Sequence, residues 1–242
     1  MSEVVNIICM KWGTKYGAEY VNKLYGMVAR NMSRQFRFIC LTDDNTGFRD
    51  EVESFSLPEL ALPDGAPERG WNKLTTFISP LHDIQGKTLF LDLDVIIVGA
   101  LDGFFDLPDD FYIIRDFVRT DGTGNSSVYL FEAGKYVDII EYFRENFEAI
   151  KAKHRNEQEY LSHYLLEKNT LSYWPKGWCV SFKYDCLPGV WGSWFSESKV
   201  PSGAKIVIFH GNPNPDDALV GKSGKFYRRV KPATWISNYW QE

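Results

Sequence analysis

The stretch LFLDLDVIIV, residues 89–98, joins an apolar strand to two acidic residues. Its apolar residues are typical of a strand that is buried on both faces of a parallel sheet. Asp92 and Asp94 stand two positions apart, and side chains at such positions of an extended chain point the same way. We therefore expect both carboxylates in one small volume, where their repulsion favours a bound cation. Hard oxygen ligands suit Mg²⁺ or Mn²⁺ better than zinc.

Composition limits the class of protein. The 242 residues are 44% hydrophobic and 24% charged, which is ordinary for a folded domain with a sizeable core. A formal net charge of −5 gives no general attraction to nucleic acid, so we expect no nucleic-acid partner. No apolar run is long enough for a signal peptide or a membrane span. We expect a cytoplasmic protein without a membrane span, and the sequence leaves the oligomeric state open.

Strands and helices alternate over the first 98 residues. We predict strands at 4–10, 36–41, 52–57 and 89–98, with helices at 16–32 and 71–79. This alternation predicts an α/β fold with a mixed, mainly parallel sheet that helices cover on both faces. Ligands of such sheets bind where strands end, so the polar residues that follow the strands mark the expected site.

The remainder of the chain has less regular patterning. We predict strands at 110–116, 125–132 and 205–210 and helices at 134–150 and 156–167. Six of the eight tryptophans lie between Trp174 and Trp240, among many turn residues. No repeat or linker divides the chain, so we predict one domain over 1–242 with an irregular, aromatic-rich C-terminal extension.

His210 ends the apolar run IVIFH, residues 206–210. Histidine is the commonest nitrogen ligand of divalent metals in proteins. A lone histidine at the end of a strand is more often a structural residue. Together with Asp92 and Asp94, His210 is nevertheless a candidate third metal ligand.

The run LFLDLDVIIVGALDGFF resembles the D-x-D region of GT-A fold, nucleotide-sugar-dependent glycosyltransferases. The segments ICMKWGTKYGAEYVNKLY, FRFICLTDD, GWNKLTTF and IVIFHGNPNP are, in this order, similar to small bacterial and phage glycosyltransferases distantly related to family 8. The resemblance covers roughly residues 4–215. It implies a GT-A (Rossmann-like) fold with a nucleotide-binding half at 1–98 and an acceptor- or sugar-binding half at 99–242. It also implies a metal-dependent hexosyltransferase that moves a sugar from a nucleotide-sugar donor, with UDP expected, to a carbohydrate or other hydroxyl acceptor.

The resemblance further implies roles for individual residues. The ligands of Mn²⁺ or Mg²⁺ would be Asp92, Asp94 and His210. The residues that bind the nucleotide and donor would be Met10, Lys11, Asp43, Asp44, Trp71, Lys73 and Leu93. Asn125 and Gln158 would lie beside the donor sugar and the acceptor as catalytic residues.

Two positions depart from the pattern of the family. The family 8 signature carries a phosphate-binding lysine after its histidine, whereas HGNPNPDDAL places Asn214 near that point. Candidate replacements are Lys222, Lys225 and Lys231. The family's N-x-G element reads Asn-Ser-Ser at 125–127, and the serine at its third position narrows the room for an acceptor.

Several alternatives remain open at the level of sequence. A neutral Gln158 at the anomeric carbon favours retention of configuration. Inversion by a general base is the alternative if an acid occupies that face, and the candidates are Asp116, Asp121, Glu157 and Glu159. A haloacid-dehalogenase-type phosphatase also uses a D-x-D motif, but the following VIIV is apolar and not a Thr-bearing turn. The further alternatives are a non-catalytic sugar- or nucleotide-binding module and a nucleotidyltransferase, for which KWGTKYG is a poor phosphate loop.

Overall fold

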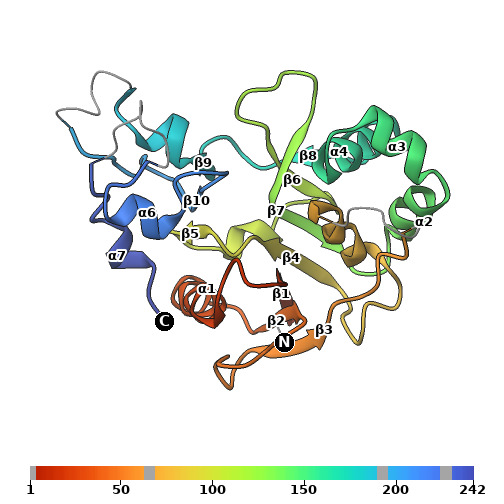
Figure 1. Cartoon of the computed structure of the whole chain (residues 1–242), viewed down its shortest axis with the longest axis horizontal. Helices are drawn as coiled ribbons and strands as arrows, with labels where there is room; N and C mark the ends of the chain where they lie inside the picture. Colours follow the sequence, from red (N-terminus) through yellow and green to blue (C-terminus); the bar gives the residue numbers. More distant parts are fainter. Residues whose placement is uncertain (1–3, 63–68, 190–195, 224–230) are drawn as a thin grey trace.

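A seven-stranded sheet forms the centre of the protein, as the computed structural model shows for residues 4–62, 69–189, 196–223 and 231–242 (Figure 1). Its strand order is β3-β2-β1-β4-β7-β6-β8. The bounds are β1 Val5–Lys11, β2 Phe36–Thr42, β3 Glu53–Ser56, β4 Lys87–Leu91, β6 Tyr112–Arg115, β7 Gly124–Glu132 and β8 Ser172–Tyr173. A second sheet has the order β5-β10-β9, with bounds β5 Val95–Ile97, β9 Cys179–Ser181 and β10 Ile206–Ile208.

The larger sheet is parallel through β3, β2, β1 and β4, whereas β7 runs antiparallel to both β4 and β6. Every residue of β1 is buried, because both faces of the sheet are covered. Ile7 and Cys9 belong to the apolar core on one face, and Ile8 and Met10 to the core on the other. This follows from the alternation of side chains along a strand. The structure thus confirms the predicted mixed, mainly parallel sheet.

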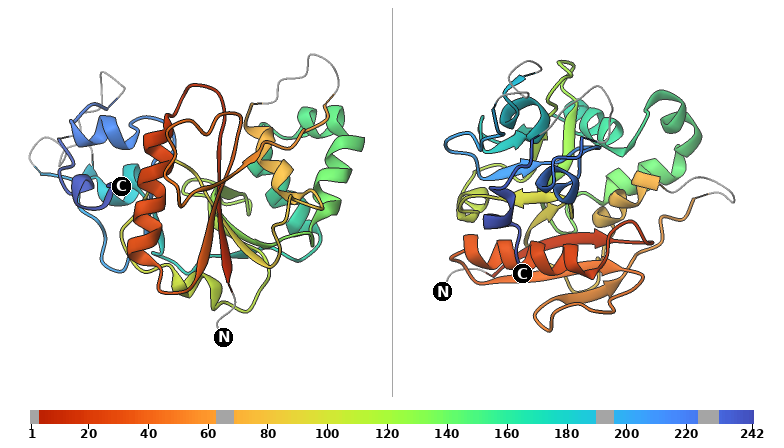
Figure 2. Two further views of the ribbon diagram at one scale, coloured as in Figure 1. Left: turned by 90° about the horizontal axis from the view of Figure 1, so that it is seen from below. Right: turned by 60° about the vertical axis from the view of Figure 1, so that its left-hand side comes forward.

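Helices cover both faces of this sheet (Figure 2). The helices are α1 Ala18–Asn31, η1 Arg69–Phe77, η2 Asp102–Phe105, α2 Val137–Glu145, α3 Phe147–Lys153, α4 Glu157–Glu167, η3 Phe182–Cys186, α6 Pro215–Leu219 and α7 Ile236–Tyr239. α1 packs on one face, whereas η1, α2, α3 and α4 pack on the other. In the described ranges, no helix combines the length and the apolar character that crossing a bilayer requires.

The prediction of one continuous strand over 89–98 is wrong. The segment is two strands, β4 in the larger sheet and β5 in the smaller one, joined by a turn at Leu93 and Asp94. Both strands are buried among apolar neighbours, so the run of apolar residues does not reveal the bend. Asp92 directly follows β4, and its N–H donates to the carbonyl oxygen of Ser127 at 2.9 Å. The acid pair therefore lies at the junction of the two sheets.

Two predicted helices also differ from the structure. The helix predicted at 134–150 is two helices, α2 and α3, which meet at Asn146. The helix predicted at 71–79 is the 3₁₀ helix η1, which begins at Arg69 and ends at Phe77. In it the hydroxyls of Thr75 and Thr76 donate to carbonyl oxygens three residues earlier, an alternative to backbone pairing that disfavours a regular α-helix.

In the described part of the C-terminal extension the helices are short, and its last residues pack against α1. The Trp240 indole meets Tyr20 edge to face, with 5.1 Å between ring centroids. The Lys23 ammonium lies 3.7 Å from the centroid of the same indole ring. Arg30 donates to the carbonyl oxygen of Tyr239 at 2.7 Å. These contacts tie the end of the chain to the first helix.

Candidate active site

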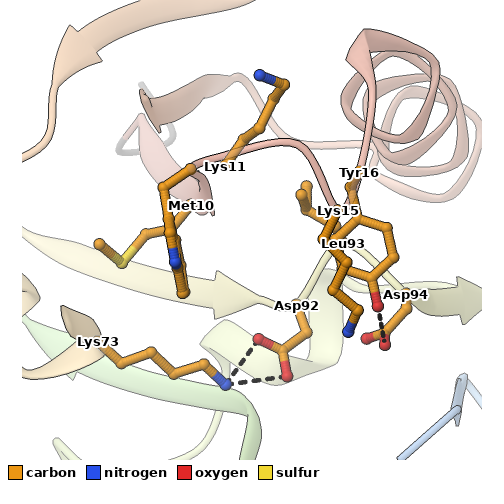
Figure 3. Close-up of a pocket in the computed structure, with 9 residues that line it drawn as sticks. Met10, Lys11, Lys15, Tyr16, Lys73, Asp92, Leu93 and Asp94 are labelled. Atoms are coloured by element: carbon orange, nitrogen blue, oxygen red, sulfur yellow. Dashed lines mark hydrogen bonds and ion pairs between the residues drawn. The ribbon is translucent and has the colours of Figure 1, made fainter. Parts of the chain in front are cut away.

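A cavity of about 240 Å³ lies where β1 and β4 end (Figure 3). The two strands are parallel neighbours, so their carboxyl ends open on the same edge of the sheet. The cavity is lined by Met10, Lys11, Trp12, Lys15, Tyr16, Lys73, Asp92, Leu93 and Asp94. These residues come from the end of β1, the loop before α1, η1 and the turn between β4 and β5.

Asp92 forms an ion pair with Lys73 of η1. The Lys73 Nζ lies 2.7 Å from Oδ1 and 2.9 Å from Oδ2 of Asp92, and 4.0 Å from Oε1 of Glu157. Burial alone lowers the pKa of Lys73, but the two carboxylates raise it by more, so that the net shift is upward. Lys73 is therefore a fixed positive charge in the wall of the cavity.

Asp94 has a different partner, the hydroxyl of Tyr16, which donates to Oδ2 at 2.7 Å (Figure 3). Burial, followed by the charge of Asp92, raises the pKa of Asp94 to about 6. Burial and the neighbouring Asp94 also raise the pKa of Tyr16, so its hydroxyl keeps the proton that it donates. Asp92 and Asp94 thus line one cavity but point to separate partners, contrary to the expectation of a common direction.

Asn125 and Gln158 lie next to this ion pair, through Ser126 of β7. The Ser126 hydroxyl donates to Glu157 Oε1 at 2.6 Å, and Lys73 Nζ lies 3.4 Å from the Ser126 carbonyl oxygen. The Ser126 N–H faces Gln158 Oε1 at 3.5 Å, a weak contact. Asn125 Oδ1 accepts from the N–H of Ser127 at 3.0 Å. The two predicted catalytic residues are therefore close to Lys73, although neither lines the cavity.

His210 is occupied by other contacts. Its Nε2 lies 2.8 Å from the hydroxyl of Ser181, and its ring stacks on Phe117 at 5.3 Å and on Tyr184 at 5.6 Å. Among the residues that the structure describes, no three His, Cys, Asp or Glu side chains are grouped to hold a metal. The predicted cluster of Asp92, Asp94 and His210 is therefore not assembled, because each of the three has a partner in the protein.

The two acids still fit a hard divalent cation. They are oxygen donors on the wall of one cavity, which is the ligand type that Mg²⁺ and Mn²⁺ prefer. Burial and the charge of Asp92 raise the pKa of Asp94, so a cation beside these carboxylates would favour the ionised form of Asp94. A metal at Asp92 and Asp94 stays a prediction, and His210 would join it only by exchanging its hydrogen bond with Ser181.

The predicted nucleotide-binding residues fall into two groups. Met10, Lys11 and Leu93 line the cavity. Asp43 and Asp44 do not line it but adjoin it, since Gly13 N–H donates to Asp43 Oδ2 at 2.9 Å and Lys11 Nζ to the carbonyl oxygen of Asp44 at 3.1 Å. The loop after β2 is thereby tied to the end of β1.

Trp71, which we expected at the donor, is not in the cavity. Its indole is 6% exposed and stacks on Phe143 of α2, with 5.1 Å between centroids. Its neighbour Lys73 faces the cavity while Trp71 fills the core between η1 and α2. Tryptophan is as well suited to a core as to a ligand, so the residue type alone did not separate the two roles.

Three lysines after His210 were considered as phosphate ligands, and the structure describes two of them. Lys222 and Lys231 are not among the lining residues of the cavity, and Lys225 lies outside the described residues. The sequence-based assignment instead missed Trp12, Lys15 and Tyr16, which form the loop between β1 and α1. Their position directly after a buried strand was the available signal.

Solved glycosyltransferases share this arrangement of strands and helices. A structure of the galactosyltransferase LgtC with donor and acceptor sugar analogs has a TM-score of 0.56 and 15% identity, covering 87% of this chain and 88% of that one. The bifunctional glycosyltransferase WbbM has a TM-score of 0.61 and 13% identity, covering 89% of this chain and 47% of that one. For apo GlyE of Streptococcus pneumoniae TIGR4 the TM-score is 0.56, with 14% identity and coverage of 88% and 56%. The chain has the GT-A glycosyltransferase fold.

The similarity to these glycosyltransferases was found by comparing structures and not by comparing sequences. No family model and no curated protein sequence matches the chain. It spans most of LgtC but only about half of the GlyE and WbbM chains. The likeness therefore supports the fold, and the chemistry has to be argued from the side chains.

The four acids considered as general bases all have partners in this GT-A fold. Glu157 accepts from Ser126. Asp121 and Glu159 both pair with Arg119, and Glu159 also accepts from Arg155 at 2.8 Å. Asp116 accepts from two backbone N–H groups at 2.8 Å each, those of residues 118 and 119. Each of the four carboxylates therefore points to a group of the protein.

Replacement of Trp71 tests its position in the core. We expect Trp71→Ala to lower the free energy of unfolding by about 3–5 kcal/mol, because it leaves a cavity against Phe143. Donor affinity should change little. Trp12→Ala is the matched control, since Trp12 lines the cavity and should lower donor affinity more than stability. Urea denaturation and donor titration measure the two effects, and a donor-binding defect in Trp71→Ala at unchanged stability would contradict the assignment.

Proposed function

We propose that the protein is a metal-dependent glycosyltransferase that transfers a sugar from a nucleoside diphosphate sugar, with UDP as the expected nucleotide, to a hydroxyl acceptor. The main support for this proposal is the cavity at the ends of β1 and β4 of the GT-A fold. Asp92, Asp94 and Lys73 line this cavity. The similar LgtC structure holds donor and acceptor sugar analogs, which supports the same class of ligands here.

The lining residues suit the parts of such a donor. Met10 and Trp12 offer apolar and aromatic surface for the nucleoside, and Lys11 adds hydrogen-bond donors. When bound at Asp92 and Asp94, Mn²⁺ or Mg²⁺ supplies Lewis-acid neutralisation of the charge on the departing diphosphate. Lys73 holds the Asp92 carboxylate and Tyr16 holds that of Asp94, so both acids are oriented before the donor arrives.

Transfer exchanges one bond for another at the anomeric carbon. The acceptor oxygen bonds to that carbon while the bond from the carbon to the phosphate oxygen breaks, and its electron pair leaves with the diphosphate. The proton of the acceptor hydroxyl passes to the departing diphosphate. We propose retention of configuration, because Gln158 is neutral and the four candidate bases have other partners. NMR of the first-formed product anomer tests this, and an inverted anomer would contradict it.

A thermal-shift panel tests the donor. UDP-, GDP-, CMP- and dTDP-sugars are each added with Mn²⁺ or with EDTA, because a ligand that binds only the folded state raises the melting temperature. We expect one nucleotide class to stabilise the protein and to require the cation. The Asp94→Ala variant is the control and should show no cation-dependent shift. Stabilisation by none of the donors would contradict the proposal, and hydrolysis of p-nitrophenyl phosphate in that case would support the phosphatase alternative.

A further inference from the structure

Lys15 lies on the loop between β1 and α1 and reaches the acid pair from above the cavity (Figure 3). The loop turns at Gly13, whose φ of +62° is in the region that favours glycine. The Lys15 side chain is exposed, and its Nζ lies 4.4 Å from the centroid of the Tyr16 ring.

Among the described residues, three lysines line the cavity, and two of them contact groups of the protein. Lys11 donates to the carbonyl oxygen of Asp44, and Lys73 is paired with Asp92. Within the described part of the chain, Lys15 makes neither a hydrogen bond nor an ion pair. An ammonium group that is exposed to a cavity and has no fixed partner is available to an anionic ligand.

We infer that Lys15 binds the diphosphate of the donor and of the leaving nucleotide. The inference rests on the proposed function. In the family 8 signature a lysine after the histidine binds the phosphates, and here we assign that role to a lysine in the loop before α1. Lys15 lines the cavity, whereas the two described lysines considered after His210, Lys222 and Lys231, are not among its lining residues.

The charges in the cavity agree with this assignment. Two carboxylates, the ammonium groups of Lys11, Lys15 and Lys73 and one divalent cation would leave three net positive charges, which is enough to offset the two negative charges of a nucleoside diphosphate sugar. When the bond to the anomeric carbon breaks, its electron pair adds negative charge to the terminal phosphate. An ammonium beside that phosphate stabilises this added charge.

The test compares the affinity for a nucleoside diphosphate with that for its nucleoside. Wild type and Lys15→Gln are titrated by calorimetry with UDP, GDP and dTDP and with uridine, guanosine and thymidine, in Mg²⁺ and again in EDTA. We expect Lys15→Gln to bind the preferred diphosphate about 10- to 100-fold more weakly, which is the range for one hydrogen bond to a charged group. Nucleoside affinity should be unchanged, and Lys15→Arg should restore most of the loss.

Lys23→Gln is the matched control, because it removes the same charge from nearby α1 while Lys23 faces Trp240 instead of the cavity. It should bind every ligand as wild type does. Wild-type diphosphate affinity in Lys15→Gln would overturn the inference and leave the proposed function standing. So would equal losses for diphosphate and nucleoside, since these would show that Lys15 only shapes the loop. If wild type binds no diphosphate in Mg²⁺, both the inference and the proposed function fail.

Discussion

The Asp94→Asn variant should lose activity and, in the absence of metal, be more stable than the wild type at pH 8. The activity should fall at least about 100-fold, since even partners behind a metal ligand cost 10- to 100-fold when they are removed. The stability should rise because the Asp94 carboxylate is buried beside Asp92, and both effects make its ionisation unfavourable. The asparagine side chain still accepts a hydrogen bond from Tyr16, so the packing is kept.

The pH dependence of this gain follows from the pKa of Asp94, which is about 6 in the folded protein and close to its ordinary value of 3.8 in the unfolded chain. Below pH 4 the carboxyl is protonated in both states, so wild type and variant should be similarly stable. Between pH 4 and pH 6 only the unfolded chain releases the proton, so the wild type loses stability as the pH rises. Above pH 6 the advantage of Asp94→Asn should stay constant at about 3 kcal/mol, which is the free energy that corresponds to the difference between these two pKa values. Urea denaturation in EDTA at pH 4, 6 and 8 measures it, and a variant less stable than wild type at pH 8 would contradict the account.

Lys73→Met should lower the free energy of unfolding by about 3–5 kcal/mol and abolish transfer. The substitution leaves Asp92 and Glu157 near each other without their shared cation, and breaking a buried pair from one side has this cost. The side chains of Lys73 and Glu157 are only 14% and 9% exposed, so water compensates little. Urea denaturation and donor titration of the variant are the measurements.

Two further variants separate this effect from a general loss of charge. Lys135→Met removes a lysine from a surface pair with Asp110, whose side chains are about half exposed, and should cost less than about 1 kcal/mol. Adding Glu157→Gln to Lys73→Met should recover part of the stability, because one unpaired carboxylate is removed, without recovering transfer. Equal, small losses in Lys73→Met and Lys135→Met would show Lys73 to be a solvated surface residue.

The order of strands and helices was predictable because it depends on the local spacing of apolar residues along the chain. The unbroken apolar strand around Ile7 predicted a sheet covered on both faces, and the structure has one. The bend at Asp94 was not predictable, because β4 and β5 are equally apolar. Only the pairing of Val95 with Ile208, which are far apart in the chain, separates β5 from the larger sheet. Local patterns do not contain pairings of that kind.

Part of the site was predictable because its residues lie at strand ends, and the family resemblance added Lys73 of η1. Lys11 and Asp92 were placed at the cavity because strand ends in a parallel sheet share one edge. Lys15 lies on a loop, and the direction of its side chain depends on backbone angles that composition does not give. Trp71 was misplaced because an irregular helix turns Lys73 to the ligand and Trp71 to the core.

The turn at Leu93 and Asp94 connects the two sheets. β4, before the turn, pairs with β1 and β7, whereas β5, after it, pairs with β10. If β5 separates from β10 in the smaller sheet, Asp94 should lose its fixed position while Asp92 keeps its own. The two carboxylates would then no longer lie together at the cavity. Ligand binding at this cavity should therefore depend on the pairing of β5 with β10, which joins the middle of the chain to its last third. A truncated version that keeps the larger sheet but lacks β10 should retain much of its secondary structure and lose binding of the proposed donor.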